Sequence, residues 1–159
     1  MTTIIITGTP GVGKSTLAEA LRKKDFWRLD IHHYYEDIST AYNRSKQCYD
    51  LDMKKVEKLV KEKIKEHPKI VIDSHVAHLL PSKLVDLCVV LVCSDLKLLQ
   101  KRLEKRGYTQ KKVRENLDAE IFQICLLESL ENGHNVMIFD VGKKQSLKKM
   151  VDAIYLKTK

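Results

Sequence analysis

The sequence predicts an α/β fold in which a parallel β-sheet carries helices on both faces. Short apolar runs alternate along the chain with longer segments whose apolar residues recur every three or four positions. The first pattern is typical of buried parallel strands and the second of amphipathic helices. Repeated alternation of the two builds a parallel sheet through helical crossovers. We expect the 159 residues to form one domain, 1–159.

The expected elements follow from these patterns. Strands are predicted at Thr2–Thr7, Phe26–Asp30, Lys69–Asp73, Leu87–Cys93 and Val136–Phe139. Helices are predicted at Lys14–Lys24, Asp52–Glu66, Leu96–Arg106 and Lys111–Glu131, with a last helix around Leu147, Met150, Val151 and Ile154. The long fourth helix should bury Val113, Leu117, Ile121, Ile124 and Leu127 and end at Asn132-Gly133. The segment Tyr34–Asp50 has no clear period, so no element is assigned to it.

A glycine-rich segment, Gly8-Thr-Pro-Gly-Val-Gly-Lys-Ser-Thr16, follows the first strand and opens the first helix. Strand, glycine loop and helix in this order form a Walker A phosphate-binding loop. Its glycines let backbone N–H groups point at phosphate oxygens, and the helix N-terminus favours the anion. The pattern predicts that Lys14 reaches the β- and γ-phosphates of a nucleotide and that Ser15 binds Mg²⁺. Gly11, Gly13 and Thr16 complete the expected nucleotide-binding set.

Asp73 closes the third predicted strand, where a phosphate-loop protein needs a second acid directed at Mg²⁺. The alternative is that Asp73 caps a helix or turn. His75 follows two residues later at the same edge, either as a catalytic group or as a hydrogen-bonded loop histidine. For the remaining histidines, surface or capping roles suffice: His32, His33, His67, His78 and His134.

Arg102 and Arg106 are four positions apart, so they share one face of the helix after the fourth strand. Gly107-Tyr108 then begins a basic turn. Arginines on a closing segment can neutralise the charge of a transferring phosphoryl group, and closure excludes water. We favour this lid function for Arg102 and Arg106 over a merely solvated basic face.

The composition limits the possible classes of function. The net charge is +8, and eight of the basic residues lie between Lys97 and Arg114, where Glu104 is the single acid. Such a stretch attracts nucleotide phosphates or RNA. The four cysteines form no CxxC pair and are expected to be reduced thiols rather than zinc ligands. No apolar run is long enough to span a bilayer, so we expect a cytoplasmic protein.

These residues give the chain a resemblance to the adenylate kinase isoenzyme 6 family along nearly its whole length. The resemblance rests on the glycine loop, the triplet Asp73-Ser-His75 and Arg102-Leu-Glu-Lys-Arg-Gly-Tyr108, with Lys112-Val-Arg-Glu-Asn116 and Ala119-Glu-Ile121 after them. It implies a nucleoside-monophosphate-kinase-like fold with a monophosphate-binding segment at about 30–52 and a short lid at about 105–115. It also implies ATP and Mg²⁺ as cofactors, AMP as acceptor and ATPase activity. In the family the residues at the positions of Asp73 and His75 place Mg²⁺ and attacking water, and the lid arginine corresponds to Arg106.

The segment 30–52 departs from the family pattern, because Asp30-Ile-His-His-Tyr-Tyr-Glu-Asp37 lacks an arginine and the nearest one that follows is Arg44. Two functions stay open. One is an enzyme that converts ATP and AMP into two ADP; the other is an ATP-switched assembly factor. The resemblance implies a small-subunit ribosomal protein or rRNA as partner of the second. Another small-molecule kinase is a weaker alternative, and a GTPase weaker still, because no Asn-Lys-x-Asp motif occurs. We expect a monomer rather than an oligomer.

Overall fold

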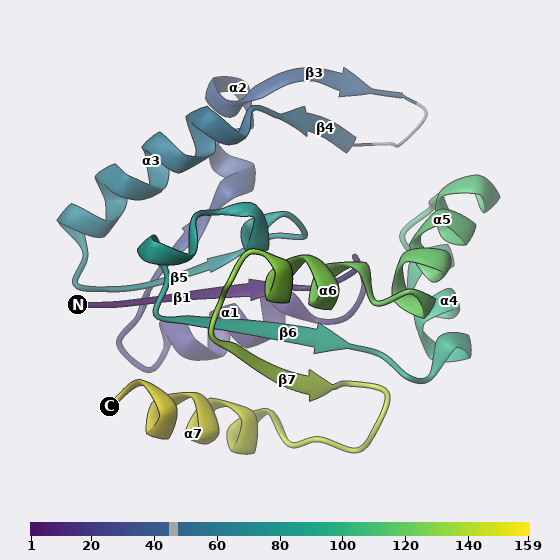
Figure 1. Ribbon diagram of the computed structural model, residues 1–159. Coiled ribbons are helices and arrows are strands. Elements are labelled where there is room, and N and C mark those ends of the chain that lie inside the picture. The colour runs from purple at the N-terminus through teal and green to yellow at the C-terminus, as the bar shows by residue number, and fades with distance from the viewer. Residues whose placement is uncertain (45–47) are drawn as a thin grey trace.

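The computed structural model of the chain describes residues 1–44 and 48–159. Five parallel strands form the central sheet in the order β2-β5-β1-β6-β7, and helices cover both of its faces (Figure 1). The predicted α/β class is therefore confirmed. The strands of this sheet are β1 (Thr2–Thr7), β2 (Trp27–Asp30), β5 (Lys69–Asp73), β6 (Leu87–Val92) and β7 (Val136–Asp140). Each lies within a residue of its predicted position.

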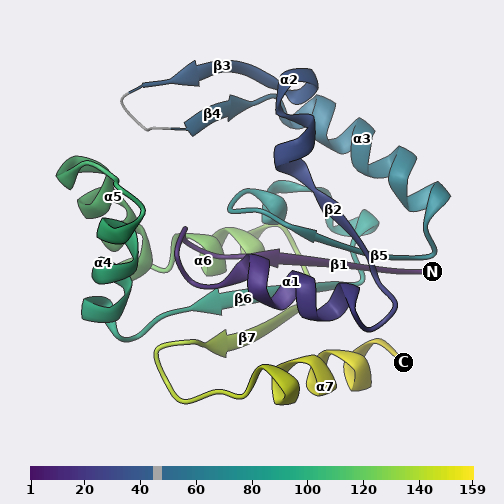
Figure 2. The same cartoon turned by 180° about the vertical axis from the view of Figure 1, so that it is seen from behind.

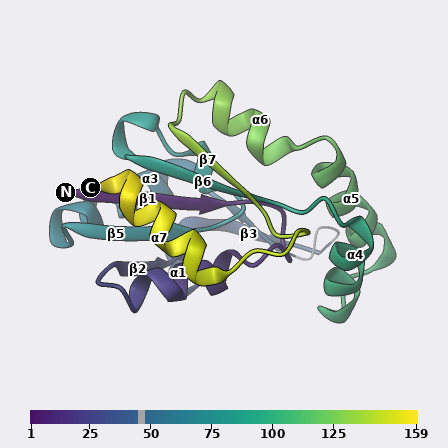
Figure 3. The same ribbon diagram turned by 90° about the horizontal axis from the view of Figure 1, so that it is seen from below.

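The two faces of the sheet follow from the alternation of side chains along each strand. Ile4 and Ile6 of β1 pack on one face with α1 (Lys14–Arg22) and α7 (Leu147–Thr158). Ile5 lies on the opposite face, where α3 (Met53–Glu66) supplies Val56 and Val60. Figure 3 shows α6 (Ile124–Glu131) on the side of the sheet opposite α1. Because both faces are covered, the central strands are apolar along their whole length.

The predicted single helix Lys111–Glu131 is wrong. The chain instead forms α5 (Gln110–Ile121) and α6, broken at Gln123, whose φ of 52° is left-handed. The break is needed because α5 packs on α4 (Leu96–Lys105) beyond the end of the sheet, whereas α6 turns back onto β6. Val113 is buried as predicted and Leu117 is partly buried, but three predicted core residues are exposed: Ile121, Ile124 and Leu127.

The segment that the sequence left unassigned contains a short helix and a hairpin. After the 3₁₀ turn Ile31–Tyr34, α2 (Tyr35–Ile38) leads into the antiparallel strands β3 (Ser39–Asn43) and β4 (Cys48–Leu51). Positions 45–47 of the expected monophosphate-binding segment lie outside the described residues. Figure 2 shows the hairpin projecting from the same end of the molecule as the α4–α5 pair. The carboxyl ends of the strands also point to that end, so ligands are expected there.

Two shorter 3₁₀ turns, Ala77–Leu79 and Ser82–Leu84, join β5 to β6. The three longest helices begin at a capping side chain. The Asp52 carboxylate accepts from Lys54 N at the start of α3, the Thr109 hydroxyl accepts from Lys112 N at the start of α5, and the Ser146 hydroxyl accepts from Lys149 N at the start of α7. Over the described ranges, none of the helices has the length and hydrophobicity to cross a membrane.

Gly8 is the position where the fold most needs a glycine. Its φ is +152°, and a Cβ atom there would lie 2.6 Å from the Leu91 carbonyl oxygen and 2.9 Å from a Val12 methyl group. The first residue of the phosphate loop thus sits against the backbone of β6, at the carboxyl edge of the sheet. A side chain of any size at this position would push the loop away from the strand.

We therefore predict that Gly8→Ala lowers the free energy of unfolding by about 2–4 kcal/mol, because strained φ and a backbone clash add together. Gly133→Ala is the matched control: φ there is also positive, at +77°, but the nearest atom to an added Cβ is 3.7 Å away. Urea unfolding measures both. Equal losses in the two variants would show that the close approach to Leu91 does not constrain the loop.

Candidate functional site

The predicted phosphate loop joins β1 to α1 and curls through Gly11 and Gly13, whose φ values are +93° and +98°. Gly13 stands at the N-terminus of α1, and a Cβ there would meet open space. The Lys14 ammonium donates hydrogen bonds to the carbonyls of Gly8 at 2.8 Å and Thr9 at 3.1 Å, so it lies across the mouth of its own loop. Burial lowers the pKa of Lys14 to about 8. An anion at this position would stabilise the charged form and raise this pKa again.

The loop is tied to the elements around it by side chains. The Thr9 hydroxyl donates to the Glu120 carboxylate at 2.7 Å, and the other oxygen of Glu120 accepts from Cys93 N at 2.8 Å. Arg102 donates from Nη1 to the carbonyl of Gly11 at 3.2 Å. Glu120 was recognised in the sequence only as part of a family motif, with no role assigned to it. Its signal was present, because it stands seven positions after buried Val113 and so lies on the apolar face of α5.

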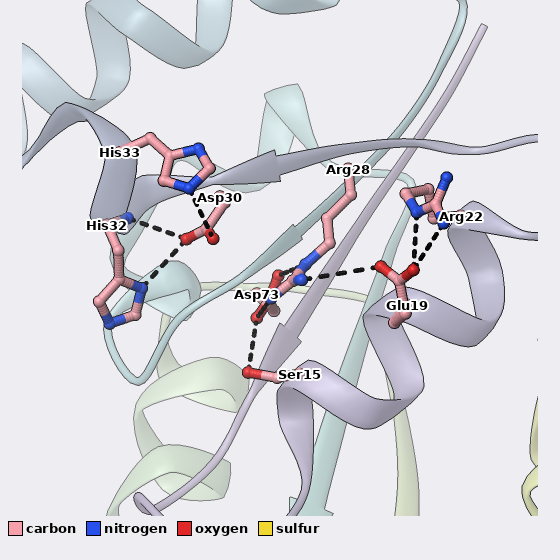
Figure 4. Close-up of polar contacts among 8 residues, drawn as sticks. All are labelled: Ser15, Glu19, Arg22, Arg28, Asp30, His32, His33 and Asp73. Atoms are coloured by element: carbon pink, nitrogen blue, oxygen red, sulfur yellow. Dashed lines mark hydrogen bonds and ion pairs between the residues drawn. The ribbon is translucent and has the colours of Figure 1, made fainter.

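Asp73 meets Ser15 and an arginine that sequence reasoning missed (Figure 4). Its carboxylate, 5% exposed, lies 3.5 Å from the Ser15 hydroxyl. Arg28 donates from Nε to Oδ1 and from Nη2 to Oδ2, both at 2.9 Å, and these bonds raise the pKa of Arg28. These contacts are with side chains, whereas a helix or turn cap would direct the carboxylate at backbone N–H groups. Arg28 could have been noticed in the sequence, because it is a charged residue between the apolar residues Trp27 and Leu29 of a predicted strand.

The residues around Lys14 and Asp73 line a polar cleft of about 440 Å³. Four chain segments contribute to it: the phosphate loop, the end of β5, the turn before α2, and the α4–α5 connection. His75 lies in this cleft, and burial, followed by the charge of Lys14, lowers its pKa to about 4, so the imidazole is neutral at pH 7. The other polar or aromatic residues of the cleft include His32, Tyr35, Arg106, Tyr108, Lys112 and Asn116.

A second cleft, of about 520 Å³, lies on the other side of the loop. Gly11, Gly13 and Thr16 form its floor next to Arg102 and Arg106. Its remaining wall is mixed, with apolar side chains beside three polar ones: Leu91, Val141, Leu147 and Met150, and Lys105, Lys143 and Gln145. Gly11, Gly13, Thr16 and Arg106 border both clefts, whereas Arg102 borders this one alone. The structure thus brings Arg106 together with Lys14, Asp73 and His75, and places Arg102 on the opposite side of the loop.

The segment predicted as a lid is the end of α4, a turn at Gly107 and the start of α5. Arg106 is exposed, and its Nη1 lies 3.5 Å from the Tyr108 hydroxyl. The Lys112 ammonium lies 3.9 Å from the centre of the Tyr108 ring, a cation–π contact. Arg106 and Lys112 of this segment line the polar cleft together with the phosphate loop.

The surface or capping role expected for His78 and His134 is wrong, because both are buried. His78 Nε2 lies 2.9 Å from the Glu128 carboxylate and its Nδ1 lies 2.6 Å from the Thr7 hydroxyl. A carboxylate only accepts, so Nε2 carries the proton and Nδ1 accepts from Thr7. His134 Nε2 lies 2.8 Å from the His78 carbonyl and donates to it. His78 thus connects α6 to the end of β1, directly before the phosphate loop.

Comparison with known proteins agrees with this geometry. Residues 4–123 match the sequence family described as "AAA domain". An adenylate kinase homologue of Methanocaldococcus jannaschii, whose name is provisional, is 40% identical over 129 residues, which cover 79% of this chain and 71% of that protein. The Schizosaccharomyces pombe protein named adenylate kinase isoenzyme 6 homolog is 38% identical over 132 residues, covering 81% and 74% of the two chains. The chain belongs to the adenylate kinase isoenzyme 6 family.

The crystal structure of shikimate kinase from Bacteroides thetaiotaomicron shares the fold of this family member. The TM-score is 0.61 over 98% of this chain and 96% of that one, at 12% identity. This likeness confirms the kinase-type fold alone. The family and the phosphate loop together place the chain among the phosphate-loop kinases by sequence and fold, a class that binds nucleotides.

Titration of His78 should make stability depend on pH. Burial lowers the pKa of His78 from 6.5, despite the Glu128 carboxylate, so the unfolded chain binds this proton more readily than the folded one. The sign follows: the contribution is present above pH 6.5 and is lost as pH falls through the lowered pKa. We predict that the loss of unfolding free energy between pH 7.5 and 5.5 is smaller in His78→Gln than in the wild type.

Urea unfolding at several pH values makes this measurement. His33→Gln, at a histidine that is 79% exposed, serves as the control and should retain the wild-type pH dependence. If the unfolding free energy of His78→Gln depends on pH as strongly as that of the wild type, the folded protein protonates His78 as readily as the unfolded chain does.

Proposed function

We propose that this protein is a Mg²⁺-dependent nucleoside monophosphate kinase that transfers the γ-phosphoryl group of ATP to AMP, with ATPase activity as a side reaction. One observation carries the proposal: two clefts meet at the phosphate loop and Arg106. The first combines apolar side chains, which can contact a nucleoside base, with cations that can contact phosphates, and the second holds Lys14, Arg106 and Lys112, which can contact a second phosphate. A transferase must hold two substrates on either side of the transferred group.

The donor would occupy the loop and the partly apolar cleft. Backbone N–H groups of Gly11 and Gly13, at the positive end of α1, would face the phosphates, and Lys14 would exchange its two carbonyl partners for phosphate oxygens. Leu91, Val141 and Met150 would contact the base. Ser15 and Asp73 offer hard oxygen donors 3.5 Å apart, which suits Mg²⁺. When bound, Mg²⁺ would neutralise phosphate charge.

The acceptor would enter the polar cleft from the side of the hairpin. Arg44, the nearest arginine in the expected monophosphate segment, is exposed on that hairpin. Arg106 and Lys112 line the cleft itself and would supply positive charge to the AMP phosphate. Because AMP is already an anion at neutral pH, the transfer needs positioning and charge neutralisation rather than a general base. The tilted pair of His32 and Tyr35 rings, 4.7 Å apart, would flank the acceptor nucleoside.

A second candidate, the ATP-switched assembly factor, is favoured by His75. A neutral imidazole inside the cleft can accept a hydrogen bond from water and orient it, which transfer to AMP does not require. Under this alternative, ATP hydrolysis would change the affinity of the protein for a ribosomal protein or rRNA. The net charge of +8 would favour binding to RNA.

The experiment that separates the two is a coupled assay of purified protein with Mg·ATP alone and then with each nucleoside monophosphate. The kinase proposal predicts that AMP raises ATP consumption many-fold and that ADP accumulates. Hydrolysis that is indifferent to every monophosphate would contradict it and favour the switch. Lys14→Ala is the inactive reference, since loss of one charged phosphate contact typically costs about 10²-fold or more in rate.

His75→Ala should separate the two activities. If the neutral imidazole orients water, the variant loses most of its ATPase activity while transfer to AMP, which brings its own nucleophile, falls less than about threefold. Both rates are measured on one preparation, with His33→Ala as the control at an exposed histidine. Equal loss of both rates would exclude a water-orienting role for His75.

Arg106→Ala should lower kcat by about 10²-fold and change the Kd for ATP little. The Arg106 side chain contacts Tyr108 on a glycine-hinged segment and would meet the transferring group chiefly in the closed state, where an interaction acts on rate. Lys101→Ala removes an exposed cation from α4 outside both clefts and is the control. A tenfold weaker Kd with unchanged kcat would make Arg106 a ground-state binding residue and would contradict the lid mechanism.

A further inference from the structure

Arg28 has no role in the phosphoryl transfer proposed above, yet it holds the most important carboxylate of the site. It lies on β2 and Asp73 ends the neighbouring β5, so the parallel register brings the two side chains together over the same edge of the sheet. Figure 4 shows the guanidinium lying against both oxygens of the Asp73 carboxylate. The pair is little exposed, at 19% for Arg28 and 5% for Asp73.

This contact works against cation binding at Ser15 and Asp73. A bidentate guanidinium takes one hydrogen-bonding direction on each carboxylate oxygen and cancels the charge that would attract Mg²⁺. Lys14, held on the same loop, adds a second positive charge close by. With Arg28 in place, the oxygen pair has the right donor atoms for Mg²⁺ but lacks the net negative charge that binding of a free divalent cation requires.

A second acceptor for the guanidinium stands beside the first. Arg28 Nη1 lies 3.8 Å from the Glu19 carboxylate of α1, while Glu19 also accepts two hydrogen bonds from Arg22. Arg28, Glu19 and Ser15 border a cleft of about 710 Å³ between α1 and α7. There is therefore open space next to Arg28 and a carboxylate toward which it can move when it leaves Asp73.

We propose that Arg28 is a positioning residue that keeps Asp73 closed to divalent cations in the nucleotide-free protein, and that Glu19 receives its guanidinium when Mg·ATP binds. The inference rests on the proposed Mg·ATP site. Because Arg28 neutralises Asp73, the site alone has too little negative charge to bind a free divalent cation tightly. The phosphates of ATP supply that charge, so the metal ion and the nucleotide bind together. Arg28 thereby links occupation of the metal position to occupation of the phosphate loop.

The test uses Mn²⁺ as the probe and reads its binding to the nucleotide-free protein by electron paramagnetic resonance. Arg28→Gln removes the positive charge and keeps a polar side chain. We expect its Kd for Mn²⁺ to fall by about tenfold or more, because a unit charge within a few ångströms of a divalent ion strongly affects binding at a partly buried site. Lys24→Gln removes an equal charge from an exposed side chain just after α1, outside the contacts that join Arg28 to Asp73 and Glu19, and its Kd should stay within about twofold of the wild type.

An unchanged Kd for Mn²⁺ in folded Arg28→Gln would overturn the proposal. Arg28→Lys covers the case in which Arg28→Gln does not fold, because it keeps the charge but cannot form the two-pronged contact. It should bind Mn²⁺ more tightly than the wild type, by severalfold, and a Kd equal to the wild type would count against the proposal.

Glu19→Gln tests the second position of the guanidinium. Without the Glu19 charge Arg28 has a poorer alternative to Asp73, so the Mg²⁺ concentration that gives half-maximal ATP binding by calorimetry should rise severalfold. An unchanged Mg²⁺ requirement would remove Glu19 from the proposal. Activity of the wild-type enzyme on AMP is measured separately. A wild type that transfers phosphate normally while Arg28→Gln shows no gain in Mn²⁺ binding refutes this inference and leaves the proposed function intact.

Discussion

The geometry of the site depends on the close approach of the phosphate loop to the end of β6. Gly8 lies against the Leu91 carbonyl with no room for a side chain, and Thr9 is bound through Glu120 to the backbone of Cys93. These contacts fix the loop with its N-terminal half on the sheet and its C-terminal half at the start of α1. Only then can Lys14 and the helix N-terminus act on one anion, and only then does the loop divide the surface into two clefts.

The charges around the loop explain what can bind there. Lys14, Arg106 and Lys112 border the polar cleft, and Asp73, a carboxylate that could balance them, is already paired with Arg28. The polar cleft is therefore electropositive and suited to anions. Burial lowers the pKa of Lys14, and the charge of Arg106 adds to this shift, while Asp73 and Glu120 oppose it. Polyphosphate binding would relieve this imbalance, which is the physical basis for coupling metal binding to nucleotide binding.

The strands and the phosphate loop were predictable because their signals are local. Uniform apolar runs gave β1, β5 and β6 almost residue for residue, and the motif at Gly8–Thr16 gave the loop. The break at Gln123 was not predictable from periodicity, because apolar spacing continues across it and only packing against α4 and β6 requires the turn. The buried positions assigned to Ile121 and Leu127 failed for the same reason.

The partners of the predicted site residues were harder to find than the residues themselves. Asp73 could be identified from its place after a strand, but its contact with Arg28 joins residues 45 positions apart and depends on β2 pairing with β5. His78 gave no sequence signal of burial, since its neighbours Glu128 and Thr7 come from α6 and β1. Such contacts depend on which strands pair and in which register, and a single sequence carries little information about either.

The most direct test of the account starts from ADP rather than ATP. Purified protein is incubated with Mg·ADP alone, and the nucleotides are followed by ³¹P nuclear magnetic resonance. A kinase with one nucleotide in each cleft must form ATP and AMP in equal amounts, and Lys14→Ala must form neither. A protein that hydrolyses ATP but leaves ADP unchanged would contradict the two-cleft transfer site proposed here.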